Sequence, residues 1–431
     1  MNKQKNLRNL LLISLLFSAV SINAQTRIWS PYSRYGVGEL NFSNSTYISS
    51  MGGTAFGFRN PYTINFANPA SYSGIGAQSF LFDGGVLFSP RILNTDDASE
   101  TTLFSSLSHL IFAFPATKKW GFSLGLVPYS SIGYKINSSE HIDSIGKVNY
   151  TYEGWGGLNS FYIGTAYEIF KGFSVGMNAN YYFGNIERKR IAIFDTTGFR
   201  NSRITNKINV SDIHLVAGLQ YQIHFNNKIE EKPGYNLTFG LSGGNGTLLN
   251  ATQNVLAVHF AGDNIFAAAK DTVLNTTGEK SGIKLPLHIG GGIYFEQERK
   301  WMTGLDVEWQ KWSDYSSFGS NDSLTNSLRI SIGGGIMPKA RATATMLSRT
   351  HFLWGAHFYS NYLELKNTSL NQYGISFGFA MPIRSSNTTL QLSFEIGKTG
   401  TKENKLIEET YGKFKLGVSI SEKWFYKRKY D

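Results

Sequence analysis

The stretch FSVGMNANYYFG, at residues 173–184, alternates strictly between two kinds of side chain. One set reads Phe173, Val175, Met177, Ala179, Tyr181 and Phe183, and the other reads Ser174, Gly176, Asn178, Asn180, Tyr182 and Gly184. Successive side chains of a β-strand point to opposite faces, so this period of two predicts a strand with one apolar face and one small or polar face. The same division recurs from residue 76 almost to the C-terminus, for example at 389–397 and 413–421.

A water-soluble β-sandwich would alternate in the same way, but several features favour a barrel embedded in a membrane. The candidate strands exceed the usual length of about five or six residues, and their polar faces are rich in Gly, Ser, Asn and Gln instead of Lys and Glu. Charged residues make up 16% of the chain, against roughly 25% in soluble domains. Aromatic residues lie where strands end, as in the interfacial girdles of outer-membrane barrels: Trp120, Trp301, Trp424 and Phe425.

Turn signals place strand centres near residues 85, 109, 127, 159, 180, 215, 240, 288, 308, 332, 357, 376, 393 and 416. We therefore predict an all-β fold, a 14-stranded antiparallel transmembrane β-barrel over residues 76–425, with the even strand number of bacterial single-chain barrels. Short connections, expected on the periplasmic side, lie near 117–120, 170–172, 226–234, 296–300, 339–349 and 384–388. Longer or more variable connections, expected outside, lie near 94–101, 138–147, 195–203, 257–270, 319–323, 366–369 and 400–405. Residues 245–285 fit either two extended strands with a long loop or a segment containing a short helix at NIFAAAK.

The first 24 residues predict a secretory signal peptide, because three basic residues precede the short apolar run LLLISLLFSAV and the small-residue site INA. The chain has no cysteine, which excludes disulfides, thiolate catalysis, cysteine metal sites and lipoprotein acylation. The formal charge of +11 becomes +8 without those three basic residues. In an exported chain this charge favours the anionic lipids of the cell outer membrane over nucleic acid as a partner. Residues 426–431 are expected to form a basic C-terminal tail.

Residues 26–75 do not alternate and are dense in Gly, Asn, Ser and Pro. They carry too many large apolar groups for a solvated linker: Tyr32, Tyr35, Phe42, Tyr47, Met51, Phe56, Phe58 and Phe66. The barrel lumen is the only large enclosed volume in such an architecture, so we expect this segment to fold inside as a hatch. Pro69 disfavours helix at Asn68, and we expect Asn68, Pro69 and Ala70 to form a rigid joint that ends the hatch before the wall begins at Ala77. We expect Phe56, Phe58 and Phe66 to contact ligand or barrel, with ordinary packing of the hatch as the alternative.

Two segments carry a family resemblance. SMGGTAFGFRNPYTINFANPASYS, at 50–73, resembles the hatch end of the FadL/TodX family of outer-membrane transporters for fatty acids and aromatic hydrocarbons. IKLPLHIGGGIYFEQERKWMTGLDVEWQKWSDY, at 283–315, is similar to that family's Leu-Pro turn, glycine-rich strand and Trp-Ser strand, through Leu285, Pro286, Asp306, Trp312 and Ser313. The resemblance implies a 14-stranded barrel with an N-terminal hatch and a hydrophobic ligand. The chain departs from the family in its polar outer loops and in the tail YKRKYD after Phe425.

The polar residues predict structure more than catalysis. The eight histidines form no His-x-x-x-His or His-Glu-x-x-His pattern, so neither a metal site nor a cofactor is expected. Ser108 adjoins His109, but neighbours on a regular strand point to opposite faces, and no nucleophile elbow is present, so no enzymatic activity is expected. Asp306 and Glu308 should face the lumen, because carboxylates against lipid are costly, and we expect a hydrogen-bond network with hatch arginines such as Arg34 or Arg59.

These observations predict an outer-membrane protein for passive uptake of hydrophobic small molecules such as long-chain fatty acids or aromatic hydrocarbons. The alternative is a non-transporting FadL-like barrel that acts as a secretion-system accessory or interaction scaffold and has protein partners. The polar outer loops and the C-terminal tail favour that alternative.

Overall fold

The computed structural model describes residues 29–42, 45–196, 198–225, 234–262, 267–297, 300–337, 346–383 and 386–423. The expected signal peptide, the girdle residues Trp424 and Phe425 and the expected basic tail lie outside the described residues. The elements, in chain order, are η1 (Pro31–Arg34), β1 (Glu39–Leu40), α2 (Thr46–Ser49), η2 (Pro69–Gly74), β2 (Ser79–Asn94), β3 (Ser99–Pro115), β4 (Trp120–Pro128), β5 (Ser130–Ile142), β6 (Gly146–Phe170), β7 (Phe173–Phe194), β8 (Asn201–Phe225), β9 (Tyr235–Gly244), β10 (Thr247–Phe260), β11 (Asp271–Leu285), β12 (His288–Gln297), β13 (Trp301–Gln310), η3 (Trp312–Asp314), β14 (Ser316–Ser317), β15 (Ser327–Ile336), α3 (Met346–Arg349), β16 (His351–Leu365), β17 (Thr368–Pro382), β18 (Thr388–Thr399), η4 (Glu403–Lys405) and β19 (Glu408–Lys423).

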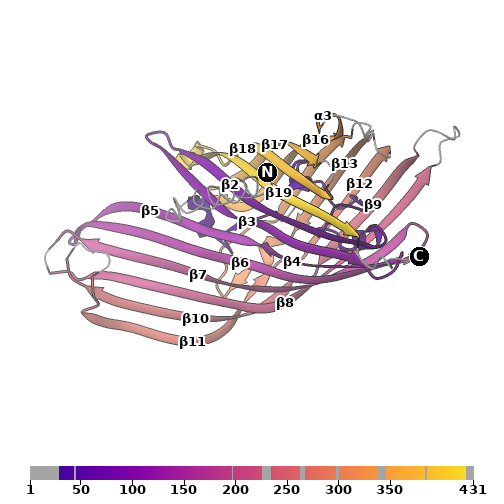
Figure 1. Cartoon of the computed structure of the whole chain (residues 1–431). Coiled ribbons are helices and arrows are strands. Elements are labelled where there is room, and N and C mark those ends of the chain that lie inside the picture. The colour runs from indigo at the N-terminus through magenta and orange to yellow at the C-terminus, as the bar shows by residue number, and fades with distance from the viewer. Residues whose placement is uncertain are drawn as a thin grey trace, which may run out of the picture.

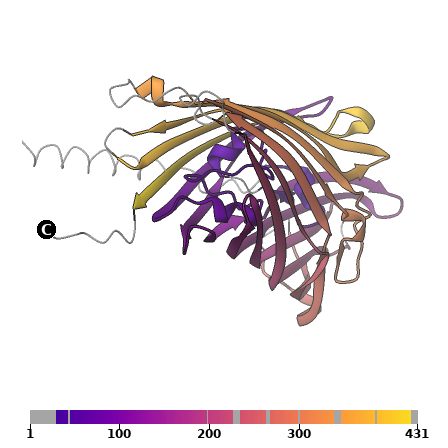
Figure 2. The same ribbon diagram turned by 90° about the vertical axis from the view of Figure 1, so that its right-hand side faces the viewer.

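The strands form one antiparallel sheet that closes on itself through the pairing of β19 with β2 (Figures 1 and 2). Three wall strands are interrupted, so that β4 continues as β5, β9 as β10 and β11 as β12. Counted as continuous walls, and without the two-residue pieces β1 and β14, the sheet has 14 strands at the predicted centres. The prediction of a closed 14-stranded antiparallel barrel is confirmed.

The alternation in the sequence becomes an inner and an outer surface. In β17, residues 370 to 380 with even numbers are buried, and the intervening ones are exposed on the outside of the barrel. Ile375 and Phe377, for example, are each 54% exposed. An apolar outer face of this kind is stable against lipid and unfavourable against water, which agrees with an outer-membrane location.

Six strands extend beyond the rest of the wall at the end of the barrel expected to face outside: β5, β6, β7, β8, β10 and β11 (left side of Figure 1). We name them the outer extension. β6 and β8 have 25 residues each, whereas about 9–11 residues cross a bilayer. The surplus of about 14 residues corresponds to roughly 45 Å along a strand. The expected longer connection near 138–147 is therefore mostly strand, and the one near 366–369 is a tight turn at Lys366 and Asn367 between β16 and β17. Residues 245–285 contain the two strands β10 and β11 of the first alternative, and the first three residues of NIFAAAK lie outside the described residues.

Residues 29–42 and 45–75, which we name the N-terminal segment, lie inside the ring of strands (indigo in Figure 2). Glycines of the wall allow its backbone to approach. A Cβ atom at Gly240 would lie 1.8 Å from the Phe56 carbonyl oxygen, and one at Gly333 would lie 2.1 Å from that of Met51. The absence of side chains at these wall positions therefore leaves room for the segment.

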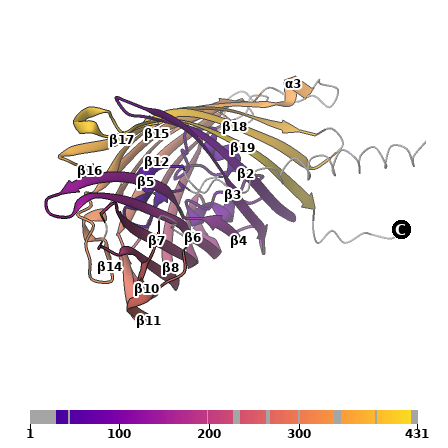
Figure 3. The same ribbon diagram turned by 90° about the vertical axis from the view of Figure 1, so that its left-hand side faces the viewer.

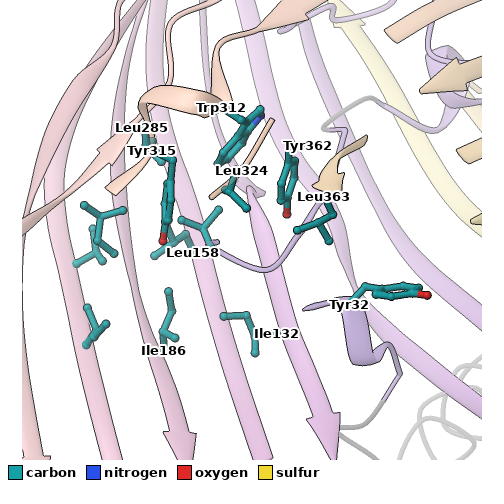
Figure 4. Close-up of a cluster of buried hydrophobic side chains, with 14 of the residues drawn as sticks. Tyr32, Ile132, Leu158, Ile186, Leu285, Trp312, Tyr315, Leu324, Tyr362 and Leu363 are labelled. Carbon is teal, nitrogen blue, oxygen red and sulfur yellow. The ribbon is translucent and has the colours of Figure 1, made fainter. Parts of the chain in front are cut away.

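The outer mouth is filled by a large cluster of buried side chains (Figure 4). Trp312 and Tyr315 reach it from the connection between β13 and β15, and Trp312 stacks on Tyr362 with ring centroids 4.5 Å apart. The N-terminal segment supplies Tyr32 and Val37 to the same cluster. None of the helices in the described ranges is long and apolar enough to cross a bilayer.

Candidate functional site

A cavity of about 180 Å³ lies in the lumen between the N-terminal segment and the wall. Its aromatic lining comprises Phe42, Phe56, Phe66, Tyr129, Tyr162 and Tyr182. Its polar lining includes Asn178, Asn180, His214, His288, Asp306, Glu308, Gln310 and Arg329. The cavity therefore combines apolar surface with a few hydrogen-bonding groups, which is the usual character of a small-molecule site.

Asp306 connects the wall to the N-terminal segment beside this cavity. Its Oδ2 atom accepts hydrogen bonds from the backbone N–H of Ala55 at 2.5 Å and of Phe56 at 2.9 Å, and Asp306 is only 3% exposed. Asp306 and Glu308 line the lumen cavity, which agrees with the expectation that both side chains face the lumen. Glu308 Oε1 accepts a hydrogen bond from Gln310 Nε2, and Gln310 Oε1 accepts one from the indole N–H of Trp312.

The expected pairing of these carboxylates with Arg34 or Arg59 is wrong. Arg59 lies 3.7 Å from Glu168 and donates to Ser174 Oγ. The Arg34 guanidinium lies over the Tyr152 ring, 4.5 Å from its centroid, near the outer mouth. Backbone N–H groups bond the Oδ2 atom of Asp306 instead, and a backbone donor leaves no signature in a sequence.

The Asn-Pro-Ala stretch forms the start of η2 against the wall. Asn68 is extended, with φ −126° and ψ 104°, and its side-chain oxygen caps η2 by accepting from Ala70 N. Its Nδ2 donates to Phe56 O and to Leu219 O of β8. Pro69 and Ala70 lie so near Gly176 that a Cβ there would be 2.5 to 2.6 Å from their backbone. The regular wall then begins at Ser79.

The three phenylalanines have different surroundings. Phe56 and Phe66 line the lumen cavity, and Phe66 stacks on Tyr162 with centroids 5.8 Å apart. Phe58 is 1% exposed and packs edge-on against Tyr294 within a buried cluster. Phe58 is therefore packed away from the cavity, whereas Phe56 and Phe66 border it, Phe66 as a member of another buried cluster.

Sequence reasoning missed a second connection between segment and wall. Arg91 of β2 bonds Glu409 of β19 and, at 2.8 Å, Glu39 of β1. Burial raises the pKa of the Glu39 carboxyl, but the Arg91 guanidinium outweighs this effect and holds the pKa below its ordinary value. Arg329 likewise donates to Gly52 O at 2.8 Å and lies over the Phe42 ring. The sequence did contain a signal for these contacts, because the charged residues stand at inward-facing positions of strands that alternate in polarity.

The wall is split between β3 and β5. The β3–β4 ladder ends at the pair Leu110 and Leu126, and in the described pairings residues 99–109 bond only to β2. Trp29 bridges this gap, which we name the seam. The backbone N–H of Trp29 donates to Gly133 O of β5, and the backbone carbonyl of Trp29 accepts from the Thr102 hydroxyl of β3. A space of about 510 Å³ opens beside it, lined by residues that include Phe104, Leu107 and Pro128.

Ser108 and His109 do not behave as neighbours on a regular strand. Gly85 of β2 faces His109 and the next residue, Val86, faces Leu107, so that Ser108 is the extra residue of a β-bulge. Ser108 Oγ lies 3.1 Å from His109 Nδ1. The expectation of opposite faces fails because the bulge breaks the alternation. No group of three or more metal-ligating side chains occurs among the described residues.

Comparisons with known proteins agree with this architecture. A model of the BamG family matches residues 6–431. The toluene transporter TodX of Pseudomonas putida is 14% identical over 90% of this chain and 100% of its own, with a TM-score of 0.59. A FadL homologue of Pseudomonas aeruginosa is 12% identical over 90% of this chain and 100% of its own, with a TM-score of 0.56. The toluene transporter TbuX of Ralstonia pickettii is 12% identical over 88% and 99%, with a TM-score of 0.54. These likenesses show that the fold is that of a FadL-like barrel. No curated protein matches the sequence.

Proposed function

The chain belongs to the BamG family, and we propose that it is a passive outer-membrane conduit for hydrophobic small molecules, in which the N-terminal segment acts as a hatch. The observation that carries the proposal is the aromatic cavity between that segment and the wall. A binding cavity formed by two separate parts of the chain can empty when one part moves, without an energy source.

The size of the cavity favours a compact ligand. A cavity of about 150 Å³ in another protein holds benzene, and this one measures about 180 Å³. A single aromatic ring therefore fits the closed arrangement, whereas a long acyl chain would need the hatch to shift. The polar lining favours a ligand that also carries a hydrogen-bonding group.

A route for the ligand would pass through two places in the barrel that side chains close in this structure. The outer mouth is filled by the cluster around Trp312, and the seam is bridged by Trp29. Ligand would enter when the mouth cluster loosens and would leave through the seam or past the hatch. Both openings are closed partly by residues of the N-terminal segment, so a movement of that segment would affect both.

The test is native mass spectrometry of the protein purified from its own outer membrane in mild detergent, with extraction of bound lipids. A co-purifying hydrophobic compound that is lost in Phe56→Ala or Phe66→Ala would support the proposal. Phe58→Leu is the control, because Phe58 packs in the cluster beside Tyr294 and does not line the cavity. A cavity that stays empty when the folded wild type is incubated with toluene and similar monoaromatic compounds would refute it.

A second candidate, an interaction barrel with protein partners, rests on the outer extension. Residues 134–142 of β5 pair only with β6, and residues 271–281 of β11 pair only with β10, among the described residues. Such edges present unpaired backbone groups to which another strand can add. A photo-crosslinker at Asn137 on the β5 edge should then capture one defined polypeptide in cells, and loss of that product in Ser139→Pro would support edge pairing.

A further inference from the structure

We propose that Ser108, His109 and Asp83 form a nucleophilic triad that hydrolyses carboxylic esters at the seam. Ser108 Oγ lies 3.1 Å from His109 Nδ1, and His109 Nε2 lies 3.0 Å from Asp83 Oδ1. Both distances lie within the reach that links a nucleophile, a base and the group that orients the base. This inference is independent of transport, because it needs only access of an ester to Ser108.

The wall fixes the base and its orienting group. His109 and Asp83 are both 0% exposed and lie on adjacent strands, β3 and β2. A Cβ at Gly85 would lie 2.8 Å from His109 Cε1, so the glycine opposite the ring makes space for it. With Asp83 accepting from Nε2–H, the imidazole presents an unprotonated Nδ1 to the serine. The roles of the two ring nitrogens are exchanged relative to the serine-protease arrangement, but each nitrogen can accept a proton.

The β-bulge makes Ser108 accessible to an ester from the lumen. Ser108 is half-buried and lines a small cavity of about 60 Å³ in the lumen. Leu107 lines both this cavity and the 510 Å³ space at the seam. An ester can therefore lie with its acyl chain among Phe104, Leu107 and Pro128 and with its carbonyl at Ser108.

The small cavity also carries positive charge. Arg329, Lys413 and Lys415 line it, against the carboxylates Glu39 and Glu395. Cations near a reacting carbonyl stabilise the negative charge that develops on its oxygen. The environment of Ser108 thus supplies a base and an orienting carboxylate, in a cavity whose lining carries three cations and two carboxylates. The cations bond Gly52 O, Glu395 and Ser49 Oγ.

The chemistry balances without a cofactor. Ser108 Oγ attacks the ester carbonyl while its proton passes to His109 Nδ1, and a tetrahedral oxyanion forms. The bond to the alkoxy oxygen breaks, the leaving alcohol takes the proton from Nδ1, and an acyl ester on Ser108 remains. Water then attacks this ester and gives a proton to Nδ1. The acyl–Oγ bond breaks, Oγ regains that proton, and the carboxylic acid is released.

The experiment uses the full-length protein, purified in mild detergent and shown to be folded by its heat-dependent gel mobility. It is incubated with a fluorophosphonate probe and digested for mass spectrometry, and hydrolysis of p-nitrophenyl butyrate is followed in parallel. We expect phosphonylation at Ser108, and a fall in hydrolysis of at least about 100-fold in Ser108→Ala. The matched control is Ser105→Ala, an exposed serine on the same strand, which should keep wild-type activity.

Asp83→Asn distinguishes catalysis from a structural role. As a positioning residue, Asp83 should affect kcat much more than KM, because the asparagine keeps the space but orients the wrong imidazole tautomer. A folded wild type in which Ser108 stays unlabelled and hydrolysis equals that of Ser108→Ala would overturn the proposal. The hydrogen-bonded chain would then serve only to hold the bulge beside the N-terminal segment.

Discussion

Replacing Asp306 with alanine should loosen the N-terminal segment without unfolding the barrel. The change removes the carboxylate oxygen that accepts from both Ala55 N and Phe56 N. Each buried donor left without an acceptor costs about 1–3 kcal/mol, so the pair costs about 2–6 kcal/mol. At 1.4 kcal/mol per factor of ten, the equilibrium between the seated and the displaced segment shifts by roughly 30-fold to 20,000-fold.

Planar bilayers measure this displacement as leak conductance through the lumen. We expect conductance to rise in the order wild type, Asp306→Asn, Asp306→Ala, since asparagine keeps one acceptor oxygen but loses the charge that strengthens both hydrogen bonds. Glu308→Gln is the control, because this carboxylate lies on the same strand and accepts from Gln310 of the wall. Equal conductance of wild type and Asp306→Ala, in barrels with native gel mobility, would refute the role of Asp306 as an anchor.

Three further predictions concern the same contacts. Gly240→Val should expel residues near Phe56, because a Cβ would lie 1.8 Å from its carbonyl oxygen, and limited proteolysis of folded protein should then cleave the N-terminal segment. Trp29→Ala removes the ring that packs on Phe104, with centroids 4.3 Å apart, and should raise uptake of a hydrophobic fluorescent dye by cells; unchanged uptake would show that the seam stays closed without the ring. Arg91→Met leaves two carboxylates unpaired and should lower the melting temperature of the detergent-solubilised barrel, as expected for a cost of about 3–5 kcal/mol.

The sequence predicted the barrel well because strand alternation is local. All fourteen predicted strand centres lie within observed strands. The period of two depends only on which face each residue takes, so it can be recognised without knowing any partner strand. The same reasoning could not show where a wall strand is interrupted or which strands continue beyond the membrane.

The contacts that make the candidate sites were much less predictable. Glu39, Arg91 and Glu409 come from three distant parts of the chain, and only closure of the barrel brings them together. Asp306 was expected to face the lumen, but its partners are backbone groups and could not be identified from residue types. Ser108 shows the limit of the alternation rule, because one extra residue in a ladder reverses the predicted direction of its side chain.

The N-terminal segment contributes different residues to the seam, the outer mouth and the lumen cavity. Trp29 bridges the seam, Val37 joins the cluster that fills the outer mouth, and Phe56 borders the lumen cavity. The segment is held at separate points, by Arg91 through Glu39 and by Asp306 through Ala55 and Phe56. Because these anchors lie at opposite ends of a stretch that includes irregular backbone, one end can be released while the other remains seated. A conduit with this arrangement could open the seam or the cavity separately, which would let a ligand pass without a continuous water-filled pore across the membrane.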